Sequence, residues 1–304
     1  MQNSCYICKT ILLEDNISVE HILPNALGGR LKSKNLLCKE CNSKTGQLFD
    51  YTLAEIAVPF IHKFNIKKER GDSQSFIARE RSTNKEIIVY PDDTTSELRP
   101  QIIRNEDSIL VRAHSPKRAL QEIEKIKKEL ALKNMHLGGD LTIKKTVDLN
   151  DKKKVTHETS FDSSLIVRAI CKIMANFYIY KTNDSGSLEA IIDFLRFDIE
   201  NLYGWPLNLN IAKQLHEGKP YHILIIKGEQ KNKALYGYFE MFGKIGFVAL
   251  LNGRYTGPNI QLNYTFDPVK AIEINHEYNF SLQVTEIINL IHIKPNSPIN
   301  HTLD

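Results

Sequence analysis

Four of the five cysteines in this 304-residue chain form two CxxC pairs, Cys5/Cys8 and Cys38/Cys41. Four thiolates arranged in this way can complete the tetrahedral coordination shell of a structural Zn²⁺ ion. The gap between the pairs, residues 9–37, is longer than the spacing of about 15–20 residues that is usual in a zinc ribbon. A further element must therefore fit between the two pairs. The cysteines alone leave open whether the module does more than bind or fold.

The residues between the pairs include a carboxylate and an imidazole side by side, Glu20 and His21. Adjacent side chains at the end of a strand point in different directions, so one can bind a metal while the other contacts a water molecule. An imidazole with a pKa near 6.5 is well suited to take a proton from that water at neutral pH. A single histidine is more often structural, so the surrounding pattern decides its interpretation.

That pattern resembles the HNH endonuclease family, in particular those members whose ββα-metal motif is held by four cysteines. The resemblance rests on Cys5, Cys8, Glu20, His21, Asn35, Cys38, Cys41 and Asn42, which stand in the order of the family motif. It implies that His21 is the general base and that Glu20 is a ligand of the catalytic metal. It also implies that Asn35 pins the loop and orients the base, and that Asn42 is the second protein ligand of that metal.

Two metals with separate tasks follow from this resemblance. The four cysteines would hold a closed, structural Zn²⁺ ion. Glu20 and Asn42 would form an open, oxygen-rich site, which suits Mg²⁺ or Mn²⁺. That ion would polarise the scissile phosphate of DNA and stabilise the leaving 3′ oxygen while His21 activates water. The expected products carry 5′-phosphate and 3′-hydroxyl ends.

Basic residues within the motif are candidates for contacts with DNA phosphates. Arg30, Lys32 and Lys44 are the main candidates, and Lys44 is the strongest because it lies near the start of the expected metal-binding helix. A basic surface that only confers solubility is the alternative for each of them. Gly28 and Gly29 allow a tight turn with a positive φ angle, and they could also let the backbone approach DNA closely.

The overall composition is that of a soluble globular protein. Hydrophobic residues make up 42% of the chain and charged residues 25%, and the net charge of +4 is compatible with a polyanionic partner without requiring one. No run of 18 apolar residues is present and the N-terminus lacks an apolar signal region, so we expect a cytoplasmic protein without a membrane partner. Cys171 is expected in a hydrophobic core.

Periodicity predicts an α+β fold in which a zinc-stapled ββα-metal module precedes a region of helices and antiparallel strands. In the module we expect strands at residues 11–13 and 17–20 and a helix from Asn42 or Ser43 to Val58, where Pro59 limits it. Three domains are predicted: the nuclease module at 1–60, an α+β connector with a basic helix at 61–160, and a C-terminal domain at 161–304.

The C-terminal domain is predicted to hold two helices followed by an antiparallel sheet. The helices are expected at 163–180 and 187–203, and the strands at 221–227, 235–242, 246–251 and 271–274. This domain could recognise the target, sense a ligand that regulates the nuclease, or form a homodimer. A two-fold dimer would place two single-strand sites across a duplex.

The sequence thus favours a metal-dependent DNA endonuclease, of the kind that acts in restriction or anti-phage defence. The main alternative is a non-catalytic, zinc-stabilised protein that binds nucleic acid. A third hypothesis makes the C-terminal region a sensor that keeps the nuclease silent until a ligand or partner binds.

Overall fold

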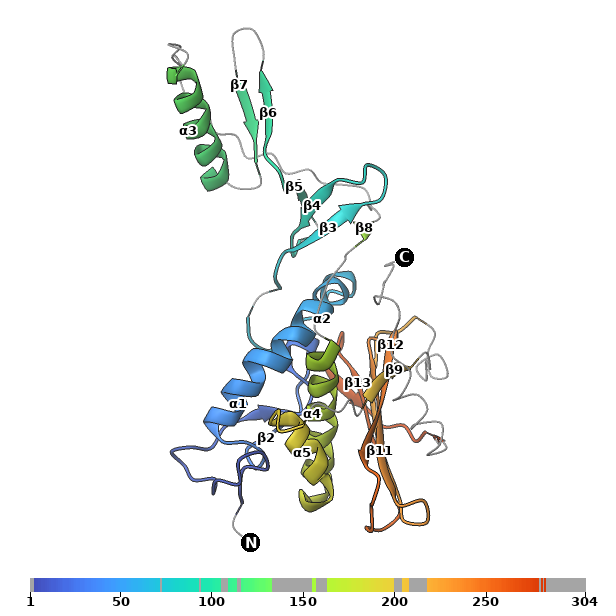
Figure 1. Cartoon of the computed structure of the whole chain (residues 1–304). Coiled ribbons are helices and arrows are strands. Elements are labelled where there is room, and N and C mark those ends of the chain that lie inside the picture. The colour runs from blue at the N-terminus through green and yellow to red at the C-terminus, as the bar shows by residue number, and fades with distance from the viewer. Residues whose placement is uncertain are drawn as a thin grey trace. The chain divides into compact units, whose positions relative to one another are not determined.

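A computed structural model provides the structure of the chain (Figure 1). It describes residues 3–71, 73–92, 94–104, 109–113, 116–132, 155–156, 163–199, 204–207, 218–278, 280 and 282. The chain divides into two compact units, the first made of Met1–Asp72 with Ser160–Pro298 and the second of Ser73–Thr159 with Ile299–Asp304. The α+β fold class is confirmed. The predicted nuclease module and the described part of the predicted C-terminal domain lie within one compact unit, and the division into three domains stays a prediction.

The first unit begins with a small ββα arrangement. Strand β1 (Glu20–His21) pairs antiparallel with β2 (Lys32–Ser33), and a 3₁₀ turn, η1 (Asn25–Leu27), lies between them. The strands predicted at 11–13 and 17–20 are mostly wrong, because the chain there makes only isolated bridges, Ser4 to Ile11 and Ile17 to Cys38. Tight turns around the cysteines leave too few consecutive extended residues for a ladder.

A long helical segment follows β2 and carries the second CxxC pair. It comprises α1 (Lys39–Thr45), a π-helical stretch η2 (Gly46–Asp50) and α2 (Tyr51–Lys63). The segment begins earlier than predicted because the Cys38 thiol caps it and accepts a hydrogen bond from the backbone N–H of Cys41 at 3.5 Å. It also continues past Pro59, because the next turn is buried: Phe60 stacks on Phe242 with ring centroids 4.9 Å apart.

The C-terminal part of the first unit contains two helices and a six-stranded antiparallel sheet. The helices are α4 (Ser163–Thr182) and α5 (Glu189–Leu195), the latter preceded by a 3₁₀ turn, η3 (Gly186–Leu188). The strands are β9 (Gly204–Leu207), β10 (His222–Glu229), β11 (Ala234–Met241), β12 (Ile245–Asn252), β13 (Ile260–Asp267) and β14 (Ile272–Ile274), in the order β14-β13-β10-β11-β12-β9. The predicted strands are present, and β9 and β13 were missed.

Only one of the two missed strands has a sequence that hides its pairing. β13 alternates apolar and polar residues, the pattern of a half-buried strand, so the sequence could have predicted it. β9 contains Pro206, which cannot donate to a ladder and is tolerated here because β9 is an edge strand. The predicted helix at 187–203 is α5, which ends at Leu195; residues 200–203 of that prediction lie outside the described residues.

Helix α4 forms the centre of the first unit and is buried along most of its length. It contacts α2 and η2 on one side and strands β9–β12 on the other (Figure 1). The sheet approaches it closely at Gly237, where an added Cβ would lie 2.6 Å from the sulfur of Met174. Tyr278 and Phe280 pack with Tyr236 and Tyr238 of β11 in a separate core cluster. Cys171, in α4, is fully buried in the core, as the sequence predicts.

The second unit is a smaller α+β body. Its strands are β3 (Phe76–Glu80), β4 (Glu86–Val89), β5 (Thr95–Glu97) and β8 (Val155–Thr156), ordered β5-β4-β3-β8, together with a hairpin of β6 (Gln101–Arg104) and β7 (Ile109–Arg112). Helix α3 (Pro116–Leu132) is the predicted basic helix, and its charged face carries intrahelical ion pairs such as Arg118 with Glu122. No helix in the described parts of either unit is long and apolar enough to cross a membrane.

A buried histidine of the sheet ties the ββα arrangement to the rest of the first unit. The Nε2–H of His222 donates to the carbonyl of Leu27 at 3.0 Å, and its Nδ1 accepts from the backbone N–H of Phe242 at 3.4 Å. Burial lowers the pKa of His222 to about 4. Only the neutral ring satisfies both contacts, because protonated Nδ1 would face another N–H group.

We therefore expect His222 to make the first unit acid-sensitive. The unfolded chain binds a proton at His222 near pH 6.5 and the folded chain only near pH 4, so its contribution is complete above about pH 6.5 and is lost as the pH falls towards about 4. The free energy of unfolding of the wild type, minus that of His222→Gln, should fall by on the order of 2 kcal/mol between about pH 7.5 and about pH 4.5. Urea denaturation at both pH values measures this difference, and a constant difference would contradict it.

Candidate active site and zinc centre

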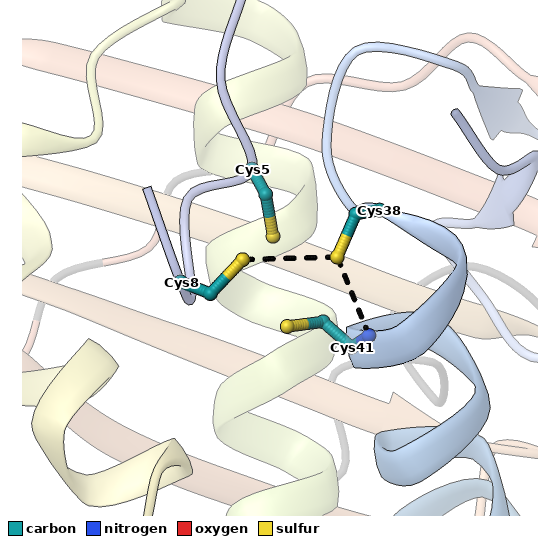
Figure 2. Close-up of side chains that lie close together, drawn as sticks. All are labelled: Cys5, Cys8, Cys38 and Cys41. Atoms are coloured by element: carbon teal, nitrogen blue, oxygen red, sulfur yellow. Dashed lines mark hydrogen bonds between the residues drawn. The ribbon is translucent and has the colours of Figure 1, made fainter. Parts of the chain in front are cut away.

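The four cysteines of the two CxxC pairs converge on one point (Figure 2). Their sulfur atoms all lie within 4.8 Å of one another, and the sulfurs of Cys8 and Cys38 are 3.7 Å apart. Four sulfurs at about 2.3 Å from a tetrahedral Zn²⁺ ion are separated by about 3.8 Å, so the arrangement fits that ion. It is the only such cluster of cysteine, histidine and acidic residues among the described residues.

Local backbone structure prepares both halves of this cluster. The first pair lies in a tight turn, closed by a hydrogen bond from Cys5 N–H to the Thr10 carbonyl at 2.8 Å and by Lys9 with a φ of 64°. The second pair begins the long helix. Burial raises the pKa of Cys5 and, together with the Cys5 charge, that of Cys41. A bound Zn²⁺ ion would supply the positive charge that allows four thiolates to share this space.

His21 lies on β1 and contacts an acidic residue from outside the motif. Its Nε2 atom is 3.0 Å from Oε2 of Glu69, and its side chain is 11% exposed. Burial lowers the pKa of His21 while Glu69 opposes this effect. The hydrogen bonds from Lys32 and His21 lower the pKa of Glu69 to about 2, so Glu69 is ionised and can only accept hydrogen bonds. Nε2 must therefore carry the proton, and in the neutral ring Nδ1 presents the free lone pair.

The segment that carries Glu69 is fastened to the ββα arrangement. The Asn25 side chain accepts hydrogen bonds from the backbone N–H groups of Glu69 and Arg70 at 2.9 and 3.2 Å and donates to the Arg70 carbonyl at 2.8 Å. Arg30 donates to the carbonyl of Lys67 at 2.7 Å. Gly28, with a φ of 82°, is buried against Ile66 and Pro268.

Glu20 points to the opposite side of β1, as the two-residue period of a strand requires. Its carboxylate is 3% exposed and contacts two residues of α4, the Lys172 ammonium at 2.8 Å and the Asn176 amide at 2.9 Å. Lys172 also binds the Asp50 carboxylate at 3.0 Å, and Asn176 accepts a hydrogen bond from the hydroxyl of Tyr6 at 2.8 Å. Burial alone would lower the pKa of Lys172, but Asp50 and Glu20 raise it, so the ammonium stays charged.

The two asparagines of the predicted site lie outside the strands, Asn35 in the loop after β2 and Asn42 in α1. The amide of Asn42 donates to the carbonyl of Val19 at 3.4 Å, next to Glu20 in the chain. Asn35 is exposed, and the Ser33 hydroxyl accepts a hydrogen bond from its backbone N–H at 3.1 Å. Within the described part of the chain, its side chain has no hydrogen bond that would pin the loop or orient His21. The structure thus does not join Glu20, His21 and Asn42 into one contact cluster, and their individual roles stay predictions.

Comparison with known families bears on this geometry. Residues 5–55 match the family described as HNH endonuclease. Searches of curated proteins and of solved structures gave no match. Residues 5–55 form an HNH endonuclease domain. The match covers the zinc cluster, β1, β2 and the first part of the long helix, and it ends before Glu69. The resemblance stated from the sequence is therefore confirmed for the HNH domain and says nothing of the remaining chain.

The three candidate DNA contacts of the HNH domain differ in their surroundings. Lys44 is exposed in the last turn of α1, where its ammonium can reach solvent or a phosphate. Lys32 is paired with Glu69 at 2.5 Å, and Arg30 holds the Lys67 carbonyl. These contacts leave Lys44 as the residue best placed for a salt-dependent phosphate contact, and all three assignments stay predictions.

Several residues around the HNH domain were missed from the sequence. Glu69 stands in the polar run Lys67-Lys68-Glu69-Arg70, which is typical of a solvated connector. Lys172 and Asn176 lie on a helix whose periodicity predicts only a hydrophobic core. Asn25 could have been found, because an amide between proline and a glycine turn is well suited to bind backbone groups. The partners of Glu20 and His21 could not, since they are far from the motif in the chain.

We expect the zinc centre to hold the HNH domain together. Replacing Cys38 by serine should abolish stoichiometric zinc binding and lower the midpoint of thermal unfolding, because structural zinc sites contribute directly to folding. Elemental analysis of purified protein and differential scanning calorimetry measure both effects. Cys171→Ala is the matched control and should retain the zinc. Full zinc occupancy in Cys38→Ser would contradict this assignment.

Lys172 should stabilise the first unit through Glu20 and Asp50. Replacing it by methionine leaves the Glu20 carboxylate buried without a counter-ion, which should lower the free energy of unfolding by about 3 kcal/mol or more. Lys181→Met, at an exposed lysine of the same helix whose ammonium lies over the rings of Phe177 and Tyr180, should change it by less than about 1 kcal/mol. Urea denaturation compares the two variants. Equal stabilities would show that the ion pair does not support the fold.

Proposed function

We propose that the protein is an endonuclease that hydrolyses phosphodiester bonds of DNA with His21 as its general base. The single observation that carries the proposal is the position of His21 on β1 of an HNH domain, with Nε2 engaged by Glu69 and Nδ1 available as a base. Among the described residues Nδ1 has no hydrogen-bond partner, so a water molecule can approach it. Basic residues close by, among them Lys32 and Arg70, favour an anionic substrate.

In this proposal, His21 takes a proton from water at Nδ1 while the water oxygen attacks phosphorus. The bond between phosphorus and the 3′ oxygen breaks, and that oxygen leaves with a proton from solvent. The products are a 5′-phosphate and a 3′-hydroxyl end, as the family resemblance implies. The zinc centre takes no part in the reaction; it joins the turn before β1 to the start of the long helix and so keeps the domain folded.

The residues that the resemblance assigns to the catalytic metal differ in how well they fit it. Mg²⁺ or Mn²⁺ dependence is expected from the family, but Glu20 does not fit as its ligand where the carboxylate now lies, because it is buried and bound to Lys172. Ligation by Glu20 would require the carboxylate to exchange Lys172 for the ion. Asn42 is partly exposed next to β1 and meets no such obstacle.

The burial of Glu20 against Lys172 favours a second candidate function. A module whose acidic motif residue serves only to pack against α4 could bind nucleic acid without cleaving it. Such a protein would show salt-sensitive binding, because phosphate contacts release counterions, and no nicking in any divalent metal. The zinc centre and the basic surface would be as they are in the nuclease.

Cleavage assays on plasmid, linear and single-stranded DNA with Mg²⁺ or Mn²⁺ test the proposed function. The wild type should cleave, and His21→Ala should be slower by about 10²- to 10⁴-fold, the usual contribution of a general base. Mapping the ends of the products should give 5′-phosphates.

The control for this test is His276→Ala, which alters an exposed histidine of the same compact unit and should cleave normally. Zinc content and thermal unfolding of His21→Ala should equal those of the wild type, so that lost cleavage is not lost folding. Undiminished cleavage by His21→Ala would overturn the mechanism. Binding without cleavage by the wild type would establish the second candidate.

A further inference from the structure

We propose that Glu69, outside the HNH domain, is the positioning residue of His21 and holds its ring with Nδ1 directed to the reacting water. This inference rests on the proposed function and adds to it a residue that neither the motif nor the family match contains. A carboxylate bound to one ring nitrogen fixes the tautomer and orientation of an imidazole, so that the other nitrogen can act as the base.

The geometry of three side chains carries the proposal. β1 and β2 pair so that His21 lies directly opposite Lys32, which places both side chains on one face of the hairpin. Glu69 bridges this cross-strand pair, with Oε2 at 3.0 Å from His21 Nε2 and Oε1 at 2.5 Å from Lys32 Nζ. Each oxygen of the carboxylate thus has its own donor. Lys32 fixes the rotation of the carboxylate, and the carboxylate in turn fixes the imidazole.

The backbone around Glu69 is held in place by hydrogen bonds, which distinguishes Glu69 from an exposed acid that contacts a histidine by chance. Its own backbone N–H and that of Arg70 donate to Asn25, and the Arg70 carbonyl accepts from Asn25. A further hydrogen bond, from the Arg30 guanidinium to the Lys67 carbonyl, holds the same segment two residues before Glu69. Asn25 and Arg30 both belong to the loop between β1 and β2. The carboxylate is therefore anchored to the same hairpin that carries the base.

This arrangement gives two residues of the HNH domain, Asn25 and Arg30, the role of holding the segment that carries Glu69. Asn25 and Arg30 contact no side chain of the zinc centre in the described hydrogen-bond network; they bind backbone groups of residues 67–70. The predicted orienting residue, Asn35, is exposed and makes no side-chain hydrogen bond among the described residues. Orientation of His21 is thereby supplied from a segment that follows the long helix.

The competing interpretation is that Glu69 blocks the site and must leave before DNA binds. A block predicts that removal of the carboxylate increases activity, whereas a positioning residue predicts that removal decreases kcat. The two interpretations therefore differ in sign, and one set of variants separates them.

The test uses the full-length protein with Glu69→Gln, which retains the size of the side chain but loses its charge, and Glu69→Asp, which retains the charge on a shorter stem. Single-turnover and steady-state cleavage of plasmid DNA should show that Glu69→Gln lowers kcat by at least about tenfold while KM changes by less than about twofold. Glu69→Asp should recover part of the loss. Glu273→Gln, at an exposed carboxylate of β14 in the same compact unit, is the matched control and should cleave like the wild type.

A second measurement does not depend on activity. NMR of protein labelled with ¹⁵N-histidine should show a downfield, slowly exchanging Nε2–H proton of His21, because the carboxylate accepts from it. The resonance is assigned by its absence in His21→Ala, and it should be lost in Glu69→Gln. Its presence in the wild type and its loss in that variant would support the positioning role even in a protein that does not cleave DNA.

Three outcomes would overturn the inference. Faster cleavage by Glu69→Gln would identify a block, and unchanged kcat would show that Glu69 does not act on His21. A higher KM of Glu69→Gln with kcat equal to that of the wild type would assign Glu69 to substrate binding. If the wild type cleaves and His21→Ala does not, the proposed function stands whichever of these results is found. Failure of the wild type to cleave, with the NMR signature present, would instead remove the nuclease proposal alone.

Discussion

The buried ammonium of Lys172 is the contact on which the arrangement of the first unit depends. It binds Glu20 of β1 and Asp50 at the end of the π-helical stretch, and it comes from α4, the central helix that packs on the sheet. A single charge thus connects three elements that are far apart in the chain. Because an isolated carboxylate is costly to bury, the contacts with Lys172 and Asn176 compensate for the burial of Glu20. The HNH domain is therefore built into a larger core and is not attached to its surface.

The pleat of β1 places the side chains of Glu20 and His21 in different surroundings. Glu20 and His21 are neighbours in the chain, so their side chains leave β1 on opposite faces. The side chain of Glu20 packs against α4, while that of His21 contacts Glu69. Strand pairing adds Lys32 beside His21, and the loop between the strands adds Asn25 and Arg30. The surroundings of the His21 side chain are in this way linked to the formation of a two-residue ladder.

Prediction from the sequence succeeded where a short stretch contains all of the interacting groups. The four-cysteine cluster needs only four cysteines and two turns, so their spacing was sufficient to predict it. Helix α4 and most strands of the sheet were predicted from periodicity. The predicted end of the first long helix at Pro59 was wrong, because α2 continues through it and the tertiary packing of Phe60 outweighs one lost hydrogen bond. The strands predicted at 11–13 and 17–20 were misplaced. The sequence there is typical of extended chain, but it forms only isolated bridges between the turns.

The sequence by itself determined that an HNH endonuclease domain is present, that four cysteines clasp it, and that His21 is its candidate base. These features depend on residues close together in the chain, where spacing limits geometry strongly. Only the tertiary structure decided the partners of those residues: Lys172 and Asn176 for Glu20, and Glu69 for His21. Each of these contacts joins segments 48 or more residues apart. Polar residues at such distances carry no periodic signal, because their positions depend on how packed helices and strands are brought together and not on their neighbours in the sequence.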